Sequence, residues 1–499
     1  MTFAKGSAAA RNYIWFAVAL IAILIAARAR ADTPAAAPAA APTPAPASYE
    51  ELEQRIRVLE RKLEIQEETQ AAVAADAPVV KVGPKGFALQ SKDGANQIRF
   101  RSELDVDGRF FNDNSTPVAS RDTWLLRRAR PIIEGTLSNI FDFRITPDFG
   151  GGKTVVQDAY IAARFRPYFT VTAGKFKEPF GLERLQSSPD NRLIELGLPS
   201  DLVPNRDIGV QISGAVFDGA LTYQIGYFNG VTDGVSADAN ATPDVDNNDD
   251  KDVAARVFTT PFASSDIFAL RGLGVGFAVG YVNQIGDATN TLLPTYKTET
   301  QRNLFGYDAA RTASGAAVAA TPTIANGGRL RWSPQAYYYL NSFGLLTEYV
   351  RVAQDVSRTF GSGATAFTRS AKLNHDSWQI LATYLLTGDD AGYKTVVPKT
   401  PFAIGKPGWG AVELAGRYSV LTVDDATFIN RGGAGAKAWF ADPTKQPSQA
   451  KAWTLGVNWY LTQNLEWVLN YTVTDFNGGA VGADRLPEKA FFTRFQVAY

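Results

Sequence analysis

The sequence contains no cysteine, one methionine, at its start, and one histidine, His375. Without cysteine there are no disulfides, so a chain of 499 residues depends on backbone pairing and packing alone. One histidine cannot supply the ligands of a transition-metal site, and no cofactor is expected. A catalytic triad is not expected either, because His375, Asp376 and Ser377 are adjacent and alternate in direction along a strand.

Net charge and long apolar runs are also missing. Lys+Arg and Asp+Glu both count 50, and the basic residues are dispersed among acids, which argues against a nucleic-acid partner. Beyond the N-terminal segment, no unbroken apolar run is long enough for a membrane helix. The 43 glycines and 12% aromatic residues suit a β-rich chain with many turns. A soluble β protein and a transmembrane barrel remain.

The N-terminal segment resembles a secretory signal. Lys5 and Arg11 precede an apolar core at 14–27, and Ala29-Arg30-Ala31 is a small-x-small cleavage site. We therefore expect a signal peptide at 1–31, against the alternative of a short membrane anchor. An extended Ala/Pro linker follows at 32–48.

Residues 49–75 predict a helix with one apolar stripe. Leu52, Ile56, Leu59 and Leu63 are spaced 4, 3 and 4 apart, as in a coiled coil. About two heptads alone are marginal in water, so association makes sense if something larger holds several copies together. A solvated single helix is the alternative.

From residue 86 to 499 the chain repeats short alternating strands. In 453–459, apolar Trp453, Leu455, Val457 and Trp459 alternate with Thr454, Gly456 and Asn458. One face therefore meets an apolar medium and the other a polar one.

Strand length, loop asymmetry and aromatic placement favour a barrel over a sandwich. Strands of about nine to eleven residues alternate between short turns and long polar loops, with aromatic residues near their ends. Residues beyond 85 accommodate about sixteen strands at roughly 25 residues each, although fourteen or eighteen would also fit. The expected fold is an all-β, antiparallel transmembrane barrel of 16 strands, preceded by a periplasmic coiled-coil helix.

The C-terminal stretch "FFTRFQVAY" predicts the strand that closes the barrel, because lipid offers unpaired backbone no water. Phe491, Phe495, Val497 and Tyr499 would face lipid, and Arg494 and Gln496 the lumen. A last strand that ends in an aromatic residue also resembles the signal read by the outer-membrane assembly machinery.

Three stretches resemble the phosphate-selective porin O and P family of Gram-negative outer membranes. They are "LLRRARPIIEGTL" (125–137), "AGKFKEPFGLERLQSS" (173–188) with "VPNRDIGVQISG" (203–214), and "LGVNWYLTQNLEWVLNYT" (455–472). The resemblance implies a homotrimer of sixteen-stranded barrels in the cell outer membrane, in contact with lipid and lipopolysaccharide. Each barrel would have its own anion-selective pore.

Selectivity requires a narrow place where charge faces a partly dehydrated ion. The segment 177–207 is long enough to fold into the lumen and carries four cations. By resemblance, Arg184 matches a constriction lysine, Arg127 and Arg128 match paired arginines of a basic ladder, and Asp158 matches a carboxylate that holds basic side chains. The predicted anion pathway comprises Arg127, Arg128, Asp158, Lys177, Arg184, Arg192, Arg206 and Arg494.

Some positions depart from the family pattern. Glu103, Asp142 and Leu196 stand where the family has basic residues, which weakens a cationic funnel. Each arginine other than Arg184 can also be read as an ordinary charged lumen wall with acidic partners. The acidic stretch 244–252 has the oxygen spacing of a calcium loop but lacks its glycine and final glutamate, so a solvated external loop is expected.

The expected function is a porin that passes small anions, with phosphate or polyphosphate implied by the resemblance, and that performs no covalent chemistry. One alternative is a porin that is non-selective or passes other solutes. Another is a barrel that serves mainly to tether the envelope through its coiled coil.

Overall fold

The computed structural model describes residues 48–84, 86–112, 121–240, 242–246, 248–312, 319–431 and 437–499. The chain divides into two units, Met1–Ala75 and Asp76–Tyr499. The expected signal peptide at 1–31 and almost all of the linker lie outside the described residues.

The described part of the first unit is the helix α2 (Tyr49–Asp76), which matches the expected helical segment. The Ser48 hydroxyl accepts a hydrogen bond from the Glu51 N–H, and Glu50 and Glu51 lie in the first turn, where negative charge favours a helix. The apolar stripe is uncovered in the single chain, with Leu59 62% and Leu63 60% exposed. Over the described residues, none of the helices has the length and apolar character needed to cross a membrane.

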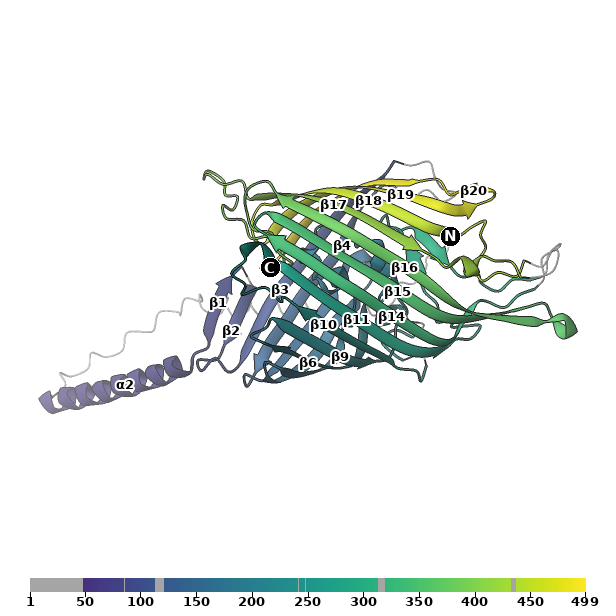
Figure 1. The fold of residues 1–499 in the computed structure, drawn as a ribbon. Coiled ribbons are helices and arrows are strands. Elements are labelled where there is room, and N and C mark those ends of the chain that lie inside the picture. Colours follow the sequence, from purple (N-terminus) through teal and green to yellow (C-terminus); the bar gives the residue numbers. More distant parts are fainter. Residues whose placement is uncertain are drawn as a thin grey trace, which may run out of the picture. The chain divides into compact units, whose positions relative to one another are not determined.

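The second unit is built on a closed antiparallel barrel of sixteen strands, as predicted (Figure 1). Each strand of the ring pairs with the next ring strand along the chain. A few short elements are not strands of the ring. In order, the strands are β3 (Gln97–Phe111), β4 (Thr123–Leu137), β5 (Phe141–Asp148), β6 (Val155–Arg166), β7 (Phe169–Lys177), β8 (Arg206–Val216), β9 (Leu221–Phe228), β10 (Asp252–Thr259), β11 (Leu273–Ile285), β14 (Ile324–Leu340), β15 (Phe343–Phe360), β16 (Phe367–Leu385), β17 (Ala411–Thr422), β18 (Pro447–Tyr460), β19 (Leu465–Ala480) and β21 (Glu488–Ala498).

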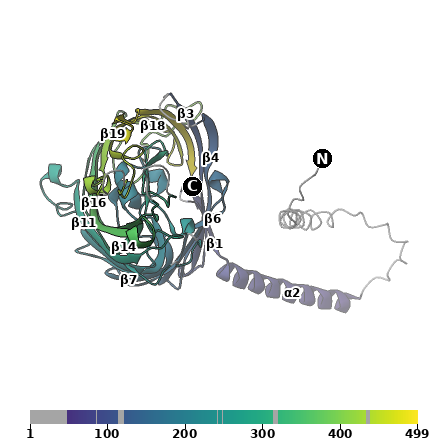
Figure 2. The ribbon, with the colours of Figure 1, turned by 90° about the vertical axis from the view of Figure 1, so that its right-hand side faces the viewer.

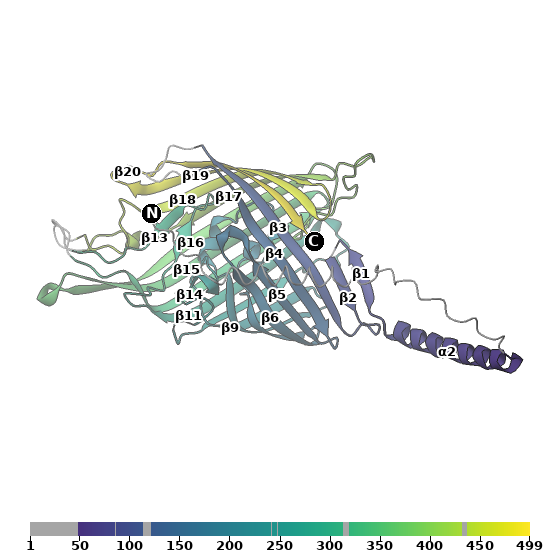
Figure 3. The ribbon, with the colours of Figure 1, turned by 180° about the vertical axis from the view of Figure 1, so that it is seen from behind.

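The C-terminal strand closes this ring, as predicted. Strand β21 pairs with β19 on one side and with β3 on the other, where Phe495 lies opposite Val106 (Figure 3). The pairing continues to the last residue, because the Tyr499 N–H donates to the Ser102 carbonyl at 2.8 Å. Closure leaves the ring without an open edge.

Several short elements are not strands of the ring. The hairpin β1 (Val79–Gly83) and β2 (Gly86–Gln90) pairs with the first residues of β3. A hairpin of β12 (Thr295–Lys297) and β13 (Asn303–Gly306) forms its own sheet, and β20 (Ala483–Asp484) extends β19. The short helices are η1 (Gly150–Gly152), α3 (Leu182–Leu185), η2 (Ser188–Asp190), η3 (Leu198–Leu202), η4 (Ala237–Ala239), η5 (Phe268–Leu270), η6 (Gly363–Thr365) and η7 (Asp425–Thr427).

The alternation predicted from the sequence divides the barrel wall into two faces. On β18, Leu455 is 59% exposed to the outside whereas Asn458 is fully buried inside. On β21, Phe495 faces outward and Arg494 and Gln496 are buried within the barrel. The apolar face of the wall is therefore external and the polar face internal, which is the arrangement of a barrel in lipid.

The two ends of the barrel differ in their connections. At the end that holds the C-terminus, β4–β5, β6–β7, β8–β9, β14–β15 and β18–β19 are joined by tight turns of two to four residues. Short turns are the periplasmic connections of outer-membrane barrels, and the longer loops are extracellular. The segment 386–410 between β16 and β17 is an exception that strand alternation does not predict, since it is a long connection at the periplasmic end.

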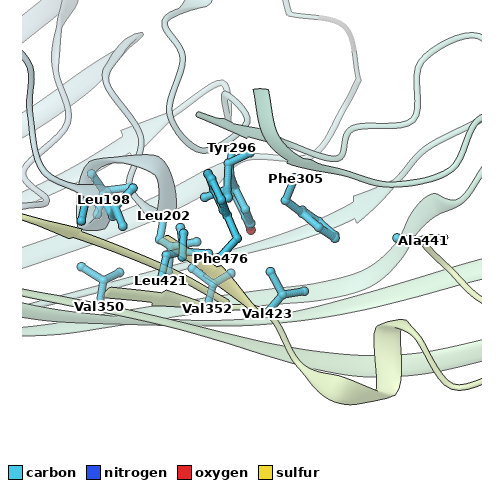
Figure 4. Packing of buried hydrophobic residues seen from close by; sticks show 14 of the residues in the cluster. Leu198, Leu202, Tyr296, Phe305, Val350, Val352, Leu421, Val423, Ala441 and Phe476 are labelled. Carbon is cyan, nitrogen blue, oxygen red and sulfur yellow. The ribbon is translucent and has the colours of Figure 1, made fainter. Parts of the chain in front are cut away.

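The lumen is filled in part by chain segments from the connections, which occupy the space inside the ring of strands in Figure 2. The largest buried apolar cluster joins three sources. Leu198 and Leu202 come from the β7–β8 loop, Tyr296 and Phe305 from the β12–β13 hairpin, and residues such as Leu421 from the wall (Figure 4). These contacts fix the connections against the opposite wall instead of leaving them in solvent.

Candidate functional site

The first element of the site is the inward loop, residues 178–205, which connects β7 to β8. Its apolar residues Phe180, Leu182 and Leu202 are fully buried, which draws the loop away from solvent and across the lumen. Gly197 permits a close approach to the far wall, because a Cβ there would lie 2.0 Å from the Gln379 amide oxygen. The inward folding predicted for 177–207 is therefore present.

Hydrogen bonds attach the inward loop to strands on the far side of the barrel. The backbone N–H of Leu182 donates to Glu348 of β15 at 2.6 Å. The backbone N–H of Ile194 donates to Asn470 of β19 at 2.7 Å. The loop thus crosses the lumen from β7 to β15 and β19. An ion can pass only through the part of the lumen that the loop leaves open.

Arg417 of β17 forms the most extensive set of contacts between the barrel wall and the inward loop. Its guanidinium donates to Glu183 at 2.8 Å and to the Glu195 carbonyl at 2.9 Å, both in the inward loop. It also forms an ion pair with Glu299 at 2.8 Å. All of these groups are buried, so each bond is formed where few water molecules can replace it.

Glu299 belongs to a second inward segment, the β12–β13 hairpin. Its carboxylate also accepts hydrogen bonds from Ser419 at 2.6 Å and from Thr454 at 2.5 Å. Gln301 of the same hairpin donates to Glu195 at 3.0 Å and so joins the two inward segments. Long polar connections between strands were expected to be loops, but buried partners on the far wall hold this hairpin inside the barrel.

Between these two segments and the β4–β8 side of the wall lies a cavity of about 290 Å³. Its lining contains seven cationic side chains and only two carboxylates, Glu195 and Asp201, among the described residues. The cations are Arg127, Arg128, Arg130, Lys177, Arg184, Arg206 and Lys297. The local excess of positive charge contrasts with the zero net charge of the whole chain.

Arg184 is held by the loop itself. Its Nη2 donates to the Ser200 carbonyl at 2.6 Å, and its buried Nε has no hydrogen-bond partner within the described chain. Lys177 lies beneath it and donates to the carbonyls of Arg184 at 2.8 Å and Gln186 at 2.5 Å. Lys177 therefore supports the backbone that carries Arg184, and the Arg184 side chain lines the cavity described above.

Arg206 is oriented by Asp158, as expected from the resemblance. The Arg206 Nε donates to Asp158 Oδ1 at 2.8 Å, and Asp158 Oδ2 lies 3.7 Å from Arg144. Asp158 borders an adjoining cavity of about 210 Å³ that also touches Lys177 and Arg206. The single carboxylate is thus shared between two arginines.

The three arginines of β4 differ in their partners. Arg127 has the loosest contact, with its Nε 3.7 Å from Glu195. Arg128 Nη1 donates to Asp105 at 2.7 Å. Arg130, which is not among the predicted pathway residues, donates to Asp148 at 2.7 Å and to Glu103 at 3.1 Å. Glu103, which departs from the family pattern, is thus a partner of the arginine ladder.

Two predicted pathway residues lie away from the cavity lining. Arg192 is buried, with Glu413 at 3.1 Å, and donates to the carbonyls of Gly392 and Lys394. Arg494 forms two hydrogen bonds with Asp107, at 2.7 and 2.9 Å. Both arginines are paired with acidic partners, which is the alternative expected for arginines other than Arg184: Arg192 ties the inward loop to β17, and Arg494 is paired within the wall.

The pKa values of the two acidic residues of the lining, Glu195 and Asp201 of the inward loop, are shifted in opposite directions. Burial alone would raise the pKa of Glu195, but Arg109 and Arg127 outweigh it and lower this pKa to about 2. Burial raises the pKa of Asp201 to about 7, although the Lys297 N–H and Arg184 oppose the shift. Glu195 is therefore a permanent negative charge, and Asp201 titrates near neutrality.

Lys297, like Arg130, is a lining cation that is not among the predicted pathway residues. It lies in β12 of the inward hairpin, and its side chain is exposed to the cavity. The alternation of buried Tyr296 with exposed Thr295 and Lys297 is a weak strand signal in the sequence. This alternation does not indicate that the strand enters the lumen.

Two other sequence features have structural partners of their own. In the acidic loop, Asp244 pairs with Lys175 at 2.6 Å, and Asp246 pairs with Lys251. Within the described residues, no cluster of three acidic, histidine or cysteine side chains is placed to hold a metal. His375 is buried, accepts the Asp424 N–H at its Nδ1, and lies 2.7 Å from the Tyr307 hydroxyl.

A closed sixteen-strand barrel with an oily exterior and a lumen narrowed by an inward loop is a porin-type channel of the outer membrane. The chain belongs to the phosphate-selective porin O and P family, whose model matches residues 97–499. The match covers the whole barrel, from the first residue of β3 to the C-terminus.

Comparison with curated proteins finds no match. Among solved structures, the channel DcaP of Acinetobacter baumannii is similar with 9% identity and a TM-score of 0.48, over 83% of this chain and 99% of that one. OmpT of Vibrio cholerae is similar with 11% identity and a TM-score of 0.44, over 81% and 100%. OmpF of Salmonella typhi has 14% identity and a TM-score of 0.43, over 81% and 98%.

Proposed function

We propose that this porin is an anion-selective diffusion channel with a preference for phosphate or polyphosphate. The observation that carries the proposal is the cavity beside the inward loop, whose lining has seven cations against two carboxylates. A cavity with this charge balance concentrates anions and repels cations. The family to which the chain belongs is described as phosphate-selective, which supports the choice of anion.

The geometry suits transient binding. Arg184 lines the cavity, and within the described residues its guanidinium bonds only to the neutral Ser200 carbonyl, so its positive charge can attract an anion. Arg206 and Arg128 are each already paired with a carboxylate, at 2.8 and 2.7 Å, so their attraction for a passing ion is moderated. Conduction needs binding that is strong enough for entry and weak enough for release.

The proposal is tested by single-channel recording of the purified protein in planar bilayers. A chloride gradient is expected to give a reversal potential of the sign that anion permeability produces. Added phosphate is expected to reduce the chloride current, because it occupies the same cationic cavity. A reversal potential of the cation-selective sign would contradict the proposal. Anion selectivity without phosphate block would leave a general anion porin.

Acidification is expected to increase anion selectivity. Asp201 has a pKa of about 7, so its carboxylate is charged at pH 8 and largely neutral at pH 6. Loss of one unit charge about 4 Å from an ion in water changes its energy by about 1 kcal/mol, in opposite directions for chloride and potassium, so the ratio of their permeabilities should rise by up to about 30-fold. Reversal potentials at the two pH values measure this change, and Asp201→Asn should remove most of it. An unchanged pH response in that variant would show that another group titrates.

The helix α2 is proposed to associate with its copies in a homotrimer, on the periplasmic side. Its apolar stripe is exposed in the single chain, and a stripe with this spacing is covered when helices form a coiled coil. Three barrels side by side would hold three copies of α2 close together, which raises their local concentration. The signal peptide at 1–31, contact with lipopolysaccharide and recognition by the assembly machinery stay predictions.

Cysteine cross-linking tests the helix association directly, because the chain has no cysteine of its own. Leu59→Cys, on the stripe, is expected to form disulfide-linked dimers under mild oxidation. Arg61→Cys, about 200° around the helix, is the matched control and should cross-link much less. Equal cross-linking of the two variants would mean that the stripe is not an interface. Conductance after deletion of 32–75 tests the role of this segment. An unchanged conductance is expected if the segment only tethers the envelope, and an altered conductance if it supports the pore.

A further inference from the structure

The β16–β17 loop, residues 386–410, is long although it lies at the end of tight turns. Its first part, residues 389–396, is held inside the barrel by the inward loop. Arg192 donates to the Gly392 carbonyl at 2.6 Å and to the Lys394 carbonyl at 2.7 Å. The Thr395 N–H donates to Asp190 at 2.7 Å, and Val396 is buried in an apolar cluster with Tyr460. The base of the loop is therefore fixed.

The second part, residues 397–410, is attached to the outside of the barrel rim. The Phe402 N–H donates to the Leu461 carbonyl at 2.7 Å, and the Phe402 ring meets the Trp459 ring edge-on at 6.2 Å. The Trp459 indole N–H donates to the Trp409 carbonyl at 2.6 Å. Trp459 has the same direction along β18 as the lipid-facing Leu455 and Val457. This part of the loop thus continues the lipid-facing wall at its periplasmic edge.

Large apolar side chains at its tip are uncovered. Ile404 is 93% exposed and Trp409 is 74% exposed. They are flanked by Lys399 and Lys406, both exposed. The tip is a turn around Gly405, whose φ is +76°. It belongs to no strand, so the exposure of its apolar side chains does not follow from the alternation of a barrel strand. Aromatic and aliphatic side chains beside lysines are the composition of segments that lie in a lipid–water interface.

We propose that residues 397–410 dock into the phospholipid leaflet on the periplasmic side of the outer membrane. Ile404 and Trp409 enter the boundary between head groups and acyl chains, and Lys399 and Lys406 meet the phosphates. The continuity with Trp459 favours lipid over another occupant, because the loop is attached to the wall at the depth where lipid begins. The inner part of the same loop is bound to Arg192 and Asp190, so the docked loop also ties the inward loop to the membrane edge.

The absence of native cysteine allows a site-specific test. Ile404→Cys is labelled with an environment-sensitive fluorophore, and the full chain is reconstituted into vesicles of phosphatidylethanolamine and phosphatidylglycerol. Quenching by lipids with a nitroxide near the head group is expected, together with protection from aqueous iodide. Trp409→Cys should give the same result. Lys92→Cys is the control, since it is exposed in the β2–β3 turn at the same end of the barrel and lacks apolar neighbours.

Two outcomes would overturn the proposal. Iodide quenching of the Ile404 label as strong as that of the Lys92 label would place the tip in water. Protection from iodide without nitroxide quenching would show that protein covers it, a second copy of this chain included. Heat-modifiable migration on gels confirms folding of each labelled protein, so that an unfolded variant is not counted as either outcome.

Discussion

Arg184→Glu is expected to abolish the anion preference of the channel. The substitution changes the charge of the cavity by two units, at a lining arginine whose guanidinium pairs with no carboxylate within the described residues. With about 1 kcal/mol per unit charge at 4 Å in water, and opposite effects on the two ions, the ratio of chloride to potassium permeability should fall by up to about 1,000-fold. Block of the chloride current by phosphate should disappear as well. Reversal potentials and phosphate titrations in planar bilayers measure both effects.

Arg164→Glu is the matched control for this charge reversal. Arg164 has the lumen-facing direction on β6, but its side chain is 50% exposed near the β6–β7 turn, 3.4 Å from Asp142. The same two-unit change there should alter selectivity only slightly, because distance and water screen it. Arg184→Gln should give an intermediate ratio. If the two glutamate variants behaved alike, general lumen charge would set the selectivity and the cavity beside the inward loop would have no special role.

Arg417→Met is expected to free both inward segments from the wall. Arg417 is 3% exposed and binds Glu183, Glu299 and the Glu195 carbonyl, so its removal leaves two buried carboxylates without their cation. Loss of one partner of a buried ion pair costs about 3–5 kcal/mol. We expect a larger single-channel conductance, more open-channel noise and weaker selectivity, since the cavity loses its defined width. Unfolding in urea should shift to a lower midpoint.

Two variants separate the positioning role of Arg417 from a simple loss of stability. Arg369→Met removes another buried arginine that binds loop carbonyls, those of Ala426, Ile429 and Ala438, on the extracellular side. It should destabilise the protein without changing selectivity. Arg417→Met combined with Glu183→Gln and Glu299→Gln removes the unpaired charge and should recover stability but not the narrow pore. Normal selectivity in that triple variant would show that Arg417 does not position the constriction.

Local regularity explains which parts of the fold could be predicted. A strand in lipid must place apolar side chains at every second position, so β18 and β21 are recognisable from their own residues. The inward loop could also be predicted, because the segment 177–207 is long enough to fold into the lumen and carries four cations. For the candidate site, the family resemblance points to a set of residues that the structure places around the two adjoining cavities: Arg127, Arg128, Asp158, Lys177, Arg184 and Arg206.

The remaining parts depend on contacts between residues far apart in the chain. Glu299 and Lys297 lie in a short hairpin, and its bonds to Arg417, Ser419 and Thr454, all more than a hundred residues away, place it inside the barrel. Arg192 and Arg494 have the charge expected of pore residues, but Glu413 binds Arg192 of the inward loop and Asp107 binds Arg494 of the wall, both away from the cavity lining.

By itself the sequence determined the class of fold, the direction of each strand face and the closing role of the C-terminus, because period-two alternation and backbone pairing are local demands of a strand in lipid. Only the tertiary structure decided which charges face the open cavity, which connections enter the lumen and which loop reaches the membrane edge. Those choices depend on which distant side chains are available to pair with each buried charge, and neighbouring residues do not contain that information.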